Sequence, residues 1–490
     1  MEFASLSFIF IFLPVLLILY YSSFLIKNRK FSEKAQNTLL FSAGLFFYAS
    51  AGGVKGLTFI LIYLFVNFLS GLLVEKSAEF RKRTIAVSLI ITANILMLLY
   101  FKYNGMINNF SVILNEHRGN LKQIIIAFGN YESASAGILL PFAFSFIVFQ
   151  VISYLSDIYT GKTNSEHNFF RFLFFMLLFM KTAQGPIMRY GDLSCQIKRP
   201  ISQDNFIAGI TRFCFGLAKK VLLADTFAKA VNAIWLIDVT KISTDLAWLG
   251  SVLYSLQIYF DFSGYSDMAV GLGYFFGFEI DENFILPYSS LSIQEFWRRW
   301  HISLSSWFRD YLYIPLGGSR CATGRILFNL FVVFLATGIW HGSNLTFVVW
   351  GLYYAFFMII ERLFLGKFLK SNPLKLLNRI YMLSVINLGW VLFRAPSLYS
   401  ALEYLKAMFT YVPSPDGTVA LSFLPLETLI FALAGIIISG AVRPARWQEG
   451  NCCSSAGFRA IKCTLSIILA VFSAIWIING SYSPSIYAAF

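Results

Sequence analysis

Long runs of apolar residues, separated by short polar loops, extend over most of the chain. Clear examples are residues 8–26, 84–103 and 345–364. A helix needs about 20 apolar residues to cross a bilayer, so these runs predict roughly ten to twelve membrane-spanning helices. The runs are continuous rather than alternating, which argues against a membrane β-barrel. We therefore predict an all-α polytopic membrane protein.

Some segments in the middle of the chain do not fit a simple bundle of spanning helices. Residues 182–193 contain Gly185-Pro186, which breaks a helix at membrane depth and is tolerated only inside protein or beside a cavity. Residues 205–235 are amphipathic, as in a helix that lies along the membrane interface. We therefore expect re-entrant and interfacial helices as well. A single integral membrane domain, 1–490, would comprise N-terminal helices (1–156), a core with the candidate site (157–366), and C-terminal helices with a tail (367–490).

The composition supports the membrane interpretation and excludes other classes. Hydrophobic residues make up 57% of the chain and charged residues only 13%, whereas soluble domains carry about 25% charged residues. The net charge of +14 is typical of basic cytoplasmic loops and of contacts with lipid headgroups, so we expect no nucleic-acid partner. No Cys/His cluster has zinc-like spacing, so we expect no metal.

One aromatic and charged stretch, Leu291–Arg320, stands out in this apolar chain. It reads LSIQEFWRRWHISLSSWFRDYLYIPLGGSR, a mixture that membrane proteins place where lipid, water and a polar ligand meet. Apolar and aromatic residues recur every three or four positions over residues 293–313, which predicts one continuous helix. His301 falls between the apolar stripe and the charged side, and so is expected to face inward.

A second histidine, His341, lies inside the next hydrophobic segment, FLATGIWHGSNLTF. An ionisable residue at that depth is by default a candidate for a functional site. Gly338 and Gly342 would leave room beside the imidazole. Thr337 and Asn344 could hydrogen-bond a ring nitrogen and fix its tautomer. The alternative for both His341 and His301 is a purely structural, hydrogen-bonded role.

Two further pairs of charged residues each have two possible roles. The adjacent Arg298 and Arg299 are either headgroup anchors or phosphate ligands. Asp261 and Asp267 lie in the long apolar segment 246–278, where carboxylates must be paired or solvated. They either satisfy local pairing or shape the site.

The chemistry open to an intramembrane histidine is proton transfer. A neutral imidazole can take the proton of a hydroxyl as that hydroxyl attacks an acyl carbonyl, which accelerates the reaction by about 10²–10⁴-fold. The chain contains no G-x-S-x-G motif of a serine nucleophile. Direct transfer from an activated acyl donor needs only a base, positioning and oxyanion donors.

Three long segments resemble the membrane-bound O-acyltransferase family, in its bacterial branch of alginate and peptidoglycan O-acetylases. They are QIYFDFSGYSDMAVGLG (257–273), FWRRWHISLSSWFRDYLYIPLGG (296–318) and GIWHG (338–342). FLPVLLILYY (12–21) and TAQGPIMRYGDL (182–193) also fit, so the resemblance covers most of the chain. It implies helices and re-entrant elements around a central tunnel or funnel. It also implies acyl transfer across the membrane from cytoplasmic acetyl-CoA, a substrate rather than a bound cofactor.

The resemblance also implies roles for individual residues. The family's near-invariant histidine matches His341, which would be the general base or proton shuttle. Its second motif histidine matches His301, which would position donor or acceptor, or assist proton transfer. Candidates for contacts with donor or acceptor are Trp297, Arg298, Arg299, Trp300, Arg309, Asn344, Asp261 and Asp267.

Partners and a relay residue follow from the same resemblance. In this branch the acetyl group usually passes to a separate periplasmic or surface transferase or esterase of the SGNH type, which modifies the polymer. Family tails often read Phe-Ile-Tyr-Phe-x-Phe. Here residues 485–490 read SIYAAF, in which Ile486, Tyr487 and Phe490 match while Ser485 and Ala488 depart. Tyr487 is thus a candidate acyl relay.

The sequence therefore predicts a multi-pass protein of the bacterial inner membrane that O-acetylates an extracytoplasmic polysaccharide. Alginate, another exopolysaccharide and peptidoglycan all remain open as acceptors. A transporter or flippase for an acylated glycan precursor is one alternative, although no internal repeat is apparent. An acyltransferase of the same family with a lipid or protein acceptor is the other.

Overall fold

A computed structural model describes residues 2–486, except 78, 118–119, 130–139, 183, 198, 200–201, 372, 415–423, 443–455 and 482–485. Tyr487, the candidate relay, lies outside the described residues. Within the described part of the chain there is no β-strand, and Phe284 and Trp300 form one isolated antiparallel bridge. The all-α prediction is confirmed.

The first ten α-helices lead from the N-terminus to the centre of the molecule. They are α1 (Leu13–Ser22), α2 (Arg29–Lys76), α3 (Phe80–Glu116), α4 (Leu121–Gly129), α5 (Phe144–Thr160), α6 (Phe169–Met176), α7 (Tyr190–Ser194), α8 (Gln203–Ala218), α9 (Asp225–Trp235) and α10 (Thr244–Phe275). The rest are α11 (Ile293–Arg299), α12 (Ile302–Phe308), α13 (Thr323–His341), α14 (Leu345–Ile360), α15 (Gly366–Ser371), α16 (Lys375–Arg394), α17 (Leu398–Phe409), α18 (Leu426–Ile438) and α19 (Ala456–Trp476).

Short π- and 3₁₀-helical pieces extend or link these helices. They are η1 (Phe8–Phe12), η2 (Ser23–Leu25), η3 (Phe179–Lys181), η4 (Cys195–Ile197), η5 (Lys219–Ala224), η6 (Pro287–Ser289), η7 (Arg309–Tyr313), η8 (Glu361–Leu365) and η10 (Ile477–Ser481).

Seven helical segments of the described chain are long and apolar enough to cross a membrane. They are Phe8–Leu25, Arg29–Lys76, Phe80–Glu116, Thr323–His341, Leu345–Leu369, Lys375–Arg394 and Ala460–Gly480. Helices α5 and α18 are apolar but shorter. The protein is thus a multi-pass membrane protein, and the higher number of roughly ten to twelve spans stays a prediction.

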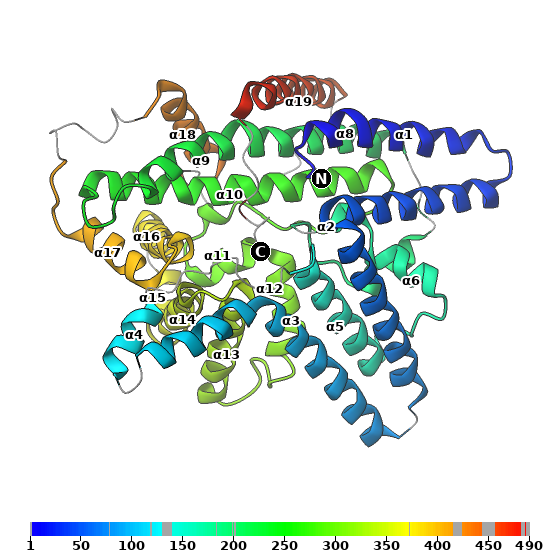
Figure 1. The fold of residues 1–490 in the computed structure, drawn as a ribbon. Coiled ribbons are helices and arrows are strands. Elements are labelled where there is room, and N and C mark those ends of the chain that lie inside the picture. The colour runs from blue at the N-terminus through cyan, green and yellow to red at the C-terminus, as the bar shows by residue number, and fades with distance from the viewer. Residues whose placement is uncertain are drawn as a thin grey trace.

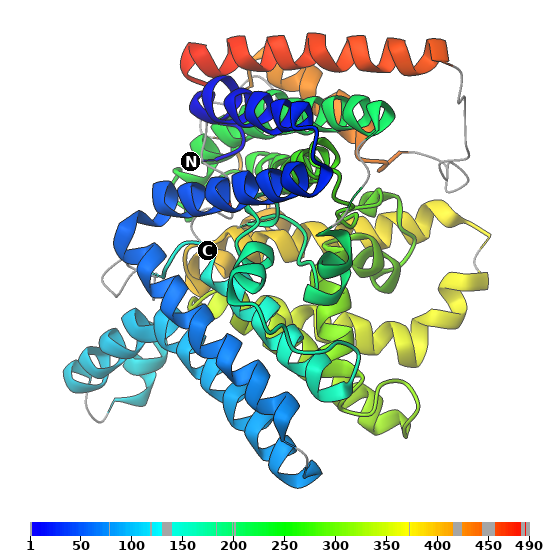
Figure 2. The same ribbon diagram turned by 90° about the vertical axis from the view of Figure 1, so that its right-hand side faces the viewer.

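Helix α2 is bent in the middle. The two apolar segments that it contains, 38–50 and 57–74, form its two arms. The arms meet at Gly53, whose φ of 67° and ψ of 173° are non-helical and produce the bend that is visible in Figures 1 and 2. A positive φ suits glycine because it has no Cβ.

Helix α10 runs across the molecule and joins its two halves (Figure 1). In that view α2, α5 and α6 lie on one side, and α14, α16 and α17 on the other. Residues 205–235, expected at the membrane interface, form a continuous segment of α8, η5 and α9 that packs along α10. Their basic side chains Arg212, Lys219 and Lys220 pair with the α10 carboxylates rather than facing lipid headgroups.

Candidate active site

A cavity of about 1060 Å³ lies among α11, α12, α13, α14, η8 and α16. Both predicted histidines, His301 and His341, line it, as do Trp297 and Trp300. Ligand sites typically enclose roughly 300–1,000 Å³ and combine an apolar wall with a few polar groups. The fold therefore brings together two histidines that are forty positions apart in the sequence.

The prediction of one continuous helix over residues 293–313 is wrong, because the helix is interrupted at His301. Helix α11 ends at Arg299 and α12 begins at Ile302, while His301 adopts φ +46°. A neighbouring extended segment causes the break: the Ile285 amide donates to Arg299 O and the Ile302 amide to Asn283 O, each at 3.0 Å. These bonds replace helical ones and hold His301 at the junction of two short helices.

The buried ring of His301 is held from one side. Its Nδ1 lies 3.1 Å from Oδ1 of Asn283, and the edge of Phe262 packs against the ring at a centroid distance of 4.6 Å. Its Nε2 is buried and has no hydrogen-bond partner among the residues that the structure describes. Burial lowers the pKa of His301 to about 3, because the charged form loses its hydration. The imidazole is therefore neutral at physiological pH.

His341 is the last residue of α13 and is packed among aromatic rings. The rings of Trp350 and Phe393 stand edge-on to it, each at a centroid distance of 5.1 Å. Trp340 lies at 5.0 Å and Phe347 at 6.2 Å. This packing fixes the orientation of the imidazole at the wall of the cavity.

The expected surroundings of His341 need correction. The Thr337 hydroxyl donates to Val333 O (2.8 Å) and the Asn344 amide to Pro396 O (3.0 Å), so neither donor is directed at the ring. Asn344 does not line the cavity. Gly338 makes room for the backbone of α14 rather than for the imidazole, because a Cβ there would lie 2.4 Å from Phe347 O.

Helix α3 supports the end of α13, a contact that was not predicted from the sequence. The Lys102 ammonium donates to Trp340 O and lies 5.1 Å from the centroid of the Trp340 indole. The Tyr103 hydroxyl is 2.8 Å from both Ile339 O and Gly342 O. Lys102 and Tyr103 thus provide hydrogen-bond donors for backbone carbonyls at the C-terminal, negative end of α13. The one available signal was a lysine near the end of the apolar run 84–103.

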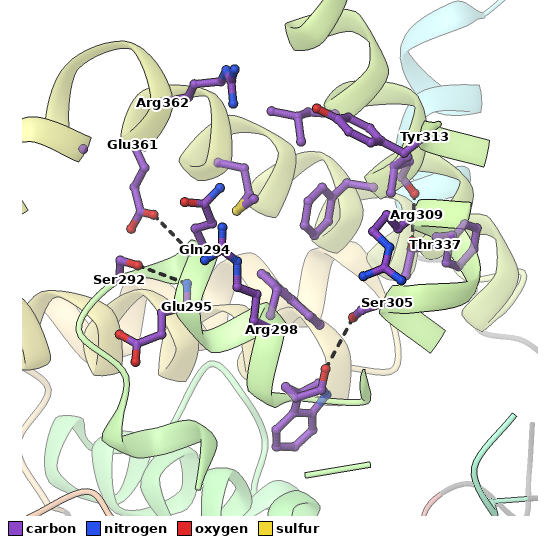
Figure 3. Close-up of a pocket in the computed structure, with 18 of the residues that line it drawn as sticks. Ser292, Gln294, Glu295, Arg298, Ser305, Arg309, Tyr313, Thr337, Glu361 and Arg362 are labelled. Atoms are coloured by element: carbon purple, nitrogen blue, oxygen red, sulfur yellow. Dashed lines mark hydrogen bonds between the residues drawn. The ribbon is translucent and has the colours of Figure 1, made fainter. Parts of the chain in front are cut away.

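Basic side chains surround the cavity. Arg298 and Arg309, two of the candidate contact residues, line it, and Arg362, Lys367 and Lys375 from the α14–α16 region join them. Figure 3 shows Arg298, Arg309 and Arg362 approaching the cavity from different elements. The last three basic residues were missed because they lie far from Arg298 in sequence.

Two acidic residues, Glu295 and Glu361, also line the cavity but are engaged elsewhere. Glu361 accepts the backbone amides of Ile293 and Gln294 and so caps α11. Glu295 pairs with Arg299 at 2.8 Å. Arg299 does not line the cavity, which separates it from its neighbour Arg298.

Asp261 and Asp267 of α10 belong to ion-pair clusters outside the cavity. Asp267 pairs with Lys219 (2.6 Å) and Arg212 (2.8 Å). Asp261 pairs with the buried Lys220 at 2.8 Å. The second oxygen of Asp261 accepts the backbone amide of Ile486 at 2.9 Å, which brings Ile486 beside this buried carboxylate.

The fold and site together define a polytopic membrane protein with a histidine-lined cavity that has a cationic rim.

Residues 163–402 match the membrane-bound O-acyltransferase family. The chain is 40% identical to a probable alginate O-acetylase, AlgI, of Pseudomonas aeruginosa over 444 residues, 89% of this chain and 79% of the relative. It is 34% identical to a peptidoglycan O-acetyltransferase of Helicobacter pylori, over 82% of this chain and 78% of that one. A teichoic acid D-alanyltransferase of Bacillus subtilis is 29% identical over 45% of this chain and 58% of its own. The chain belongs to the membrane-bound O-acyltransferase family and is a membrane acyltransferase.

Proposed function

We propose that this protein takes an acetyl group from cytoplasmic acetyl-CoA and delivers it across the bacterial inner membrane for O-acetylation of a polysaccharide or of peptidoglycan. The observation that carries the proposal is the convergence of His301 and His341 on one cavity with a basic rim. Relatives named as alginate O-acetylase and peptidoglycan O-acetyltransferase support both the reaction and the class of acceptor.

The charge around the cavity supports an anionic donor. Five basic side chains line it, whereas its two carboxylates are engaged with backbone amides or with Arg299. Coenzyme A carries phosphates, which arginine and lysine bind well. We assign the contacts with these phosphates to the rim and the thioester to the inner, aromatic end. The basic residues are Arg298, Arg309, Arg362, Lys367 and Lys375.

The inner end supplies the groups that acyl transfer needs. In the proposed step the acceptor oxygen forms a bond to the thioester carbon, the carbon–sulfur bond breaks, and the hydroxyl proton passes through imidazole to the leaving sulfur. His341 acts as general base or proton shuttle, and His301 assists. Trp297 and Trp350 line the cavity, and their buried indole N–H groups have no hydrogen-bond partner among the described residues, so they can stabilise the oxyanion.

Delivery to the polymer requires an acceptor on the far side of the membrane. We propose that a separate SGNH-type transferase or esterase receives the acetyl group. Tyr487 is the candidate relay, and the bond between Ile486 and Asp261 supports it by holding the preceding residue in the interior. Replacement of Tyr487 by phenylalanine removes the nucleophilic oxygen, and should abolish transfer to the partner while leaving donor binding intact.

The proposal is tested with the purified full-length protein and radiolabelled acetyl-CoA. His341→Ala should lower release of coenzyme A by about 10²–10⁴-fold at an unchanged melting temperature. His117→Ala is a matched control, because His117 lies at the end of α3 and does not line the cavity. Full activity of His341→Ala would overturn the assigned role. Movement of a glycan without turnover of acetyl-CoA would instead support a transporter.

A further inference from the structure

We infer that Asn283 is a positioning residue that fixes the tautomer of His301, so that its Nε2 faces the cavity as a proton acceptor. The inference rests on the proposed function. It also resolves which of two roles His301 plays, since it assigns the ring to proton transfer rather than to positioning of a substrate.

The orientation of the Asn283 side chain is determined by its neighbours. Its Oδ1 lies 3.2 Å from the Ser303 backbone nitrogen, and a backbone N–H can only donate. The Ser303 hydroxyl also donates to Oδ1, at 2.9 Å. On the other side, Nδ2 donates to the Ser266 hydroxyl at 3.2 Å. The atom of Asn283 that faces His301 is therefore its acceptor oxygen.

This orientation decides where the proton of His301 resides. Nδ1 lies 3.1 Å from Oδ1, so it must carry the hydrogen for a bond to form. In a neutral imidazole, a protonated Nδ1 leaves Nε2 with a lone pair. Nε2 is buried, has no hydrogen-bond partner within the described part of the chain, and belongs to a residue that lines the cavity. A hydroxyl in the cavity can therefore donate its proton to this atom.

Asn283 also holds the turn in which His301 lies. Its backbone oxygen accepts the Ile302 amide at 3.0 Å, and its side chain accepts from Ser303. It is only 1% exposed, so these bonds are made away from water. A substitution that simply removed the side chain would disturb both the turn and the tautomer, and the experiment must separate the two.

In the proposed reaction, His301 and His341 act at one cavity. Nε2 of His301 accepts the proton of the attacking hydroxyl as the new carbon–oxygen bond forms. The carbon–sulfur bond then breaks, and His341, as the proton shuttle, assists the transfer of that proton to the leaving sulfur. Nδ1–H stays bonded to Asn283 throughout and stabilises the imidazolium that forms transiently. Asn283 thus acts through His301 and need not touch the substrate.

Aspartate at position 283 separates the structural role from the electronic one. Asn283→Asp keeps an acceptor for the Ser303 amide and hydroxyl, and Ser266 can donate to it, so the turn is preserved. The negative charge of the introduced aspartate favours the imidazolium form of His301. It should therefore move the acid limb of the pH–rate profile to higher pH, by about 1–3 pH units. Asn283→Leu keeps the size, removes the acceptor, and should lower turnover by about 10²-fold or more.

The other charged groups around His301 are the same in these variants. They are Glu295, Arg298, Arg309, His341, Glu361, Arg362, Lys367 and Lys375 at the cavity, Lys102 beside it, and the pairs of Asp261 with Lys220 and of Asp267 with Lys219 and Arg212. A shift in the pH profile is therefore attributable to position 283. Asn283→Asp combined with His301→Ala should show no shift in its residual activity.

The experiment measures acetyl-CoA turnover against pH for the wild-type protein and these variants. An upward shift in Asn283→Asp that disappears with His301→Ala is the expected result. An unshifted profile in an active Asn283→Asp protein, with activity restored relative to Asn283→Leu, would show a purely structural role and overturn the inference. Wild-type activity in Asn283→Leu would also overturn it. An inactive wild-type protein would instead reject the proposed function.

Discussion

The contact between α13 and α14 provides a direct test of how the position of His341 determines activity. Gly338 and Gly351 face each other across this contact. An ideal Cβ on Gly338 would lie 2.4 Å from Phe347 O, and one on Gly351 would lie 2.4 Å from Phe334 O. In both cases the clashing atom is backbone, so no side-chain rotation can relieve it. Gly338→Ala must therefore separate the two helices.

The size of the separation follows from these distances. Ordinary contacts of a Cβ begin at 3.4 Å, so the backbone must move by about 1 Å. His341 lies three residues further along α13 and moves with it. A misplacement of 1 Å can lower a reaction rate by about 10²-fold. Overpacking of this kind also destabilises by about 1–3 kcal/mol.

The assay is turnover of radiolabelled acetyl-CoA together with thermal unfolding in detergent. Gly338→Ala should lower turnover by about 10²-fold and reduce the melting temperature, while the protein still folds. Gly324→Ala is the matched control, because Gly324 is in the same helix and, beyond its own helical backbone and chain neighbours, no heavy atom of the described residues lies within 4 Å of the added Cβ. It should retain wild-type turnover.

A second variant adds a quantitative check. Gly351→Ala should give a similar loss from the opposite helix. The double variant should lose less than the sum of the two, since one separation relieves both clashes. Wild-type turnover in Gly338→Ala would refute the reasoning, because it would show that the helices can part without moving His341.

Three further predictions concern other contacts. Arg298→Ala should raise the KM for acetyl-CoA about tenfold, whereas Arg299→Ala should raise it little, because only Arg298 lines the cavity. Lys220→Met should lower the free energy of unfolding by about 3–5 kcal/mol, since it leaves buried carboxylates such as Asp261 uncompensated. Tyr103→Phe should reduce turnover and lower stability by about 1–2 kcal/mol, because it removes a donor shared by two carbonyls beside His341.

Each of these predictions has a contradicting result. Equal KM values for the two arginine variants would show that Arg298 does not contact the donor. An unchanged melting temperature of Lys220→Met would show that the carboxylates paired with Lys220 are solvated. Wild-type kinetics of Tyr103→Phe would show that α3 does not hold the end of α13. The readouts are steady-state kinetics for the first and third variants and thermal unfolding for the second.

Much of the fold could be read from the sequence because hydrophobicity is a local property. Runs of apolar residues such as 84–103 had to be membrane helices. The same argument failed over 293–313, where an apolar stripe predicted a continuous helix. The apolar stripe is present, but backbone hydrogen bonds with Asn283 and Ile285 replace helical hydrogen bonds and interrupt the helix at His301.

The sequence by itself determined the all-α membrane fold, because its apolar runs are long enough to cross a bilayer, and three long motifs indicated the class of protein by resemblance. It also singled out the two histidines, because ionisable residues in apolar segments are rare and expensive. Only the tertiary structure decided what surrounds them. It brought Lys102 and Tyr103 from α3 to the end of α13, and Arg362 and Lys375 to the rim near Arg298. It also turned the acceptor oxygen of Asn283 toward His301. These contacts join residues far apart in the chain, and their geometry depends on helix packing that no local pattern encodes.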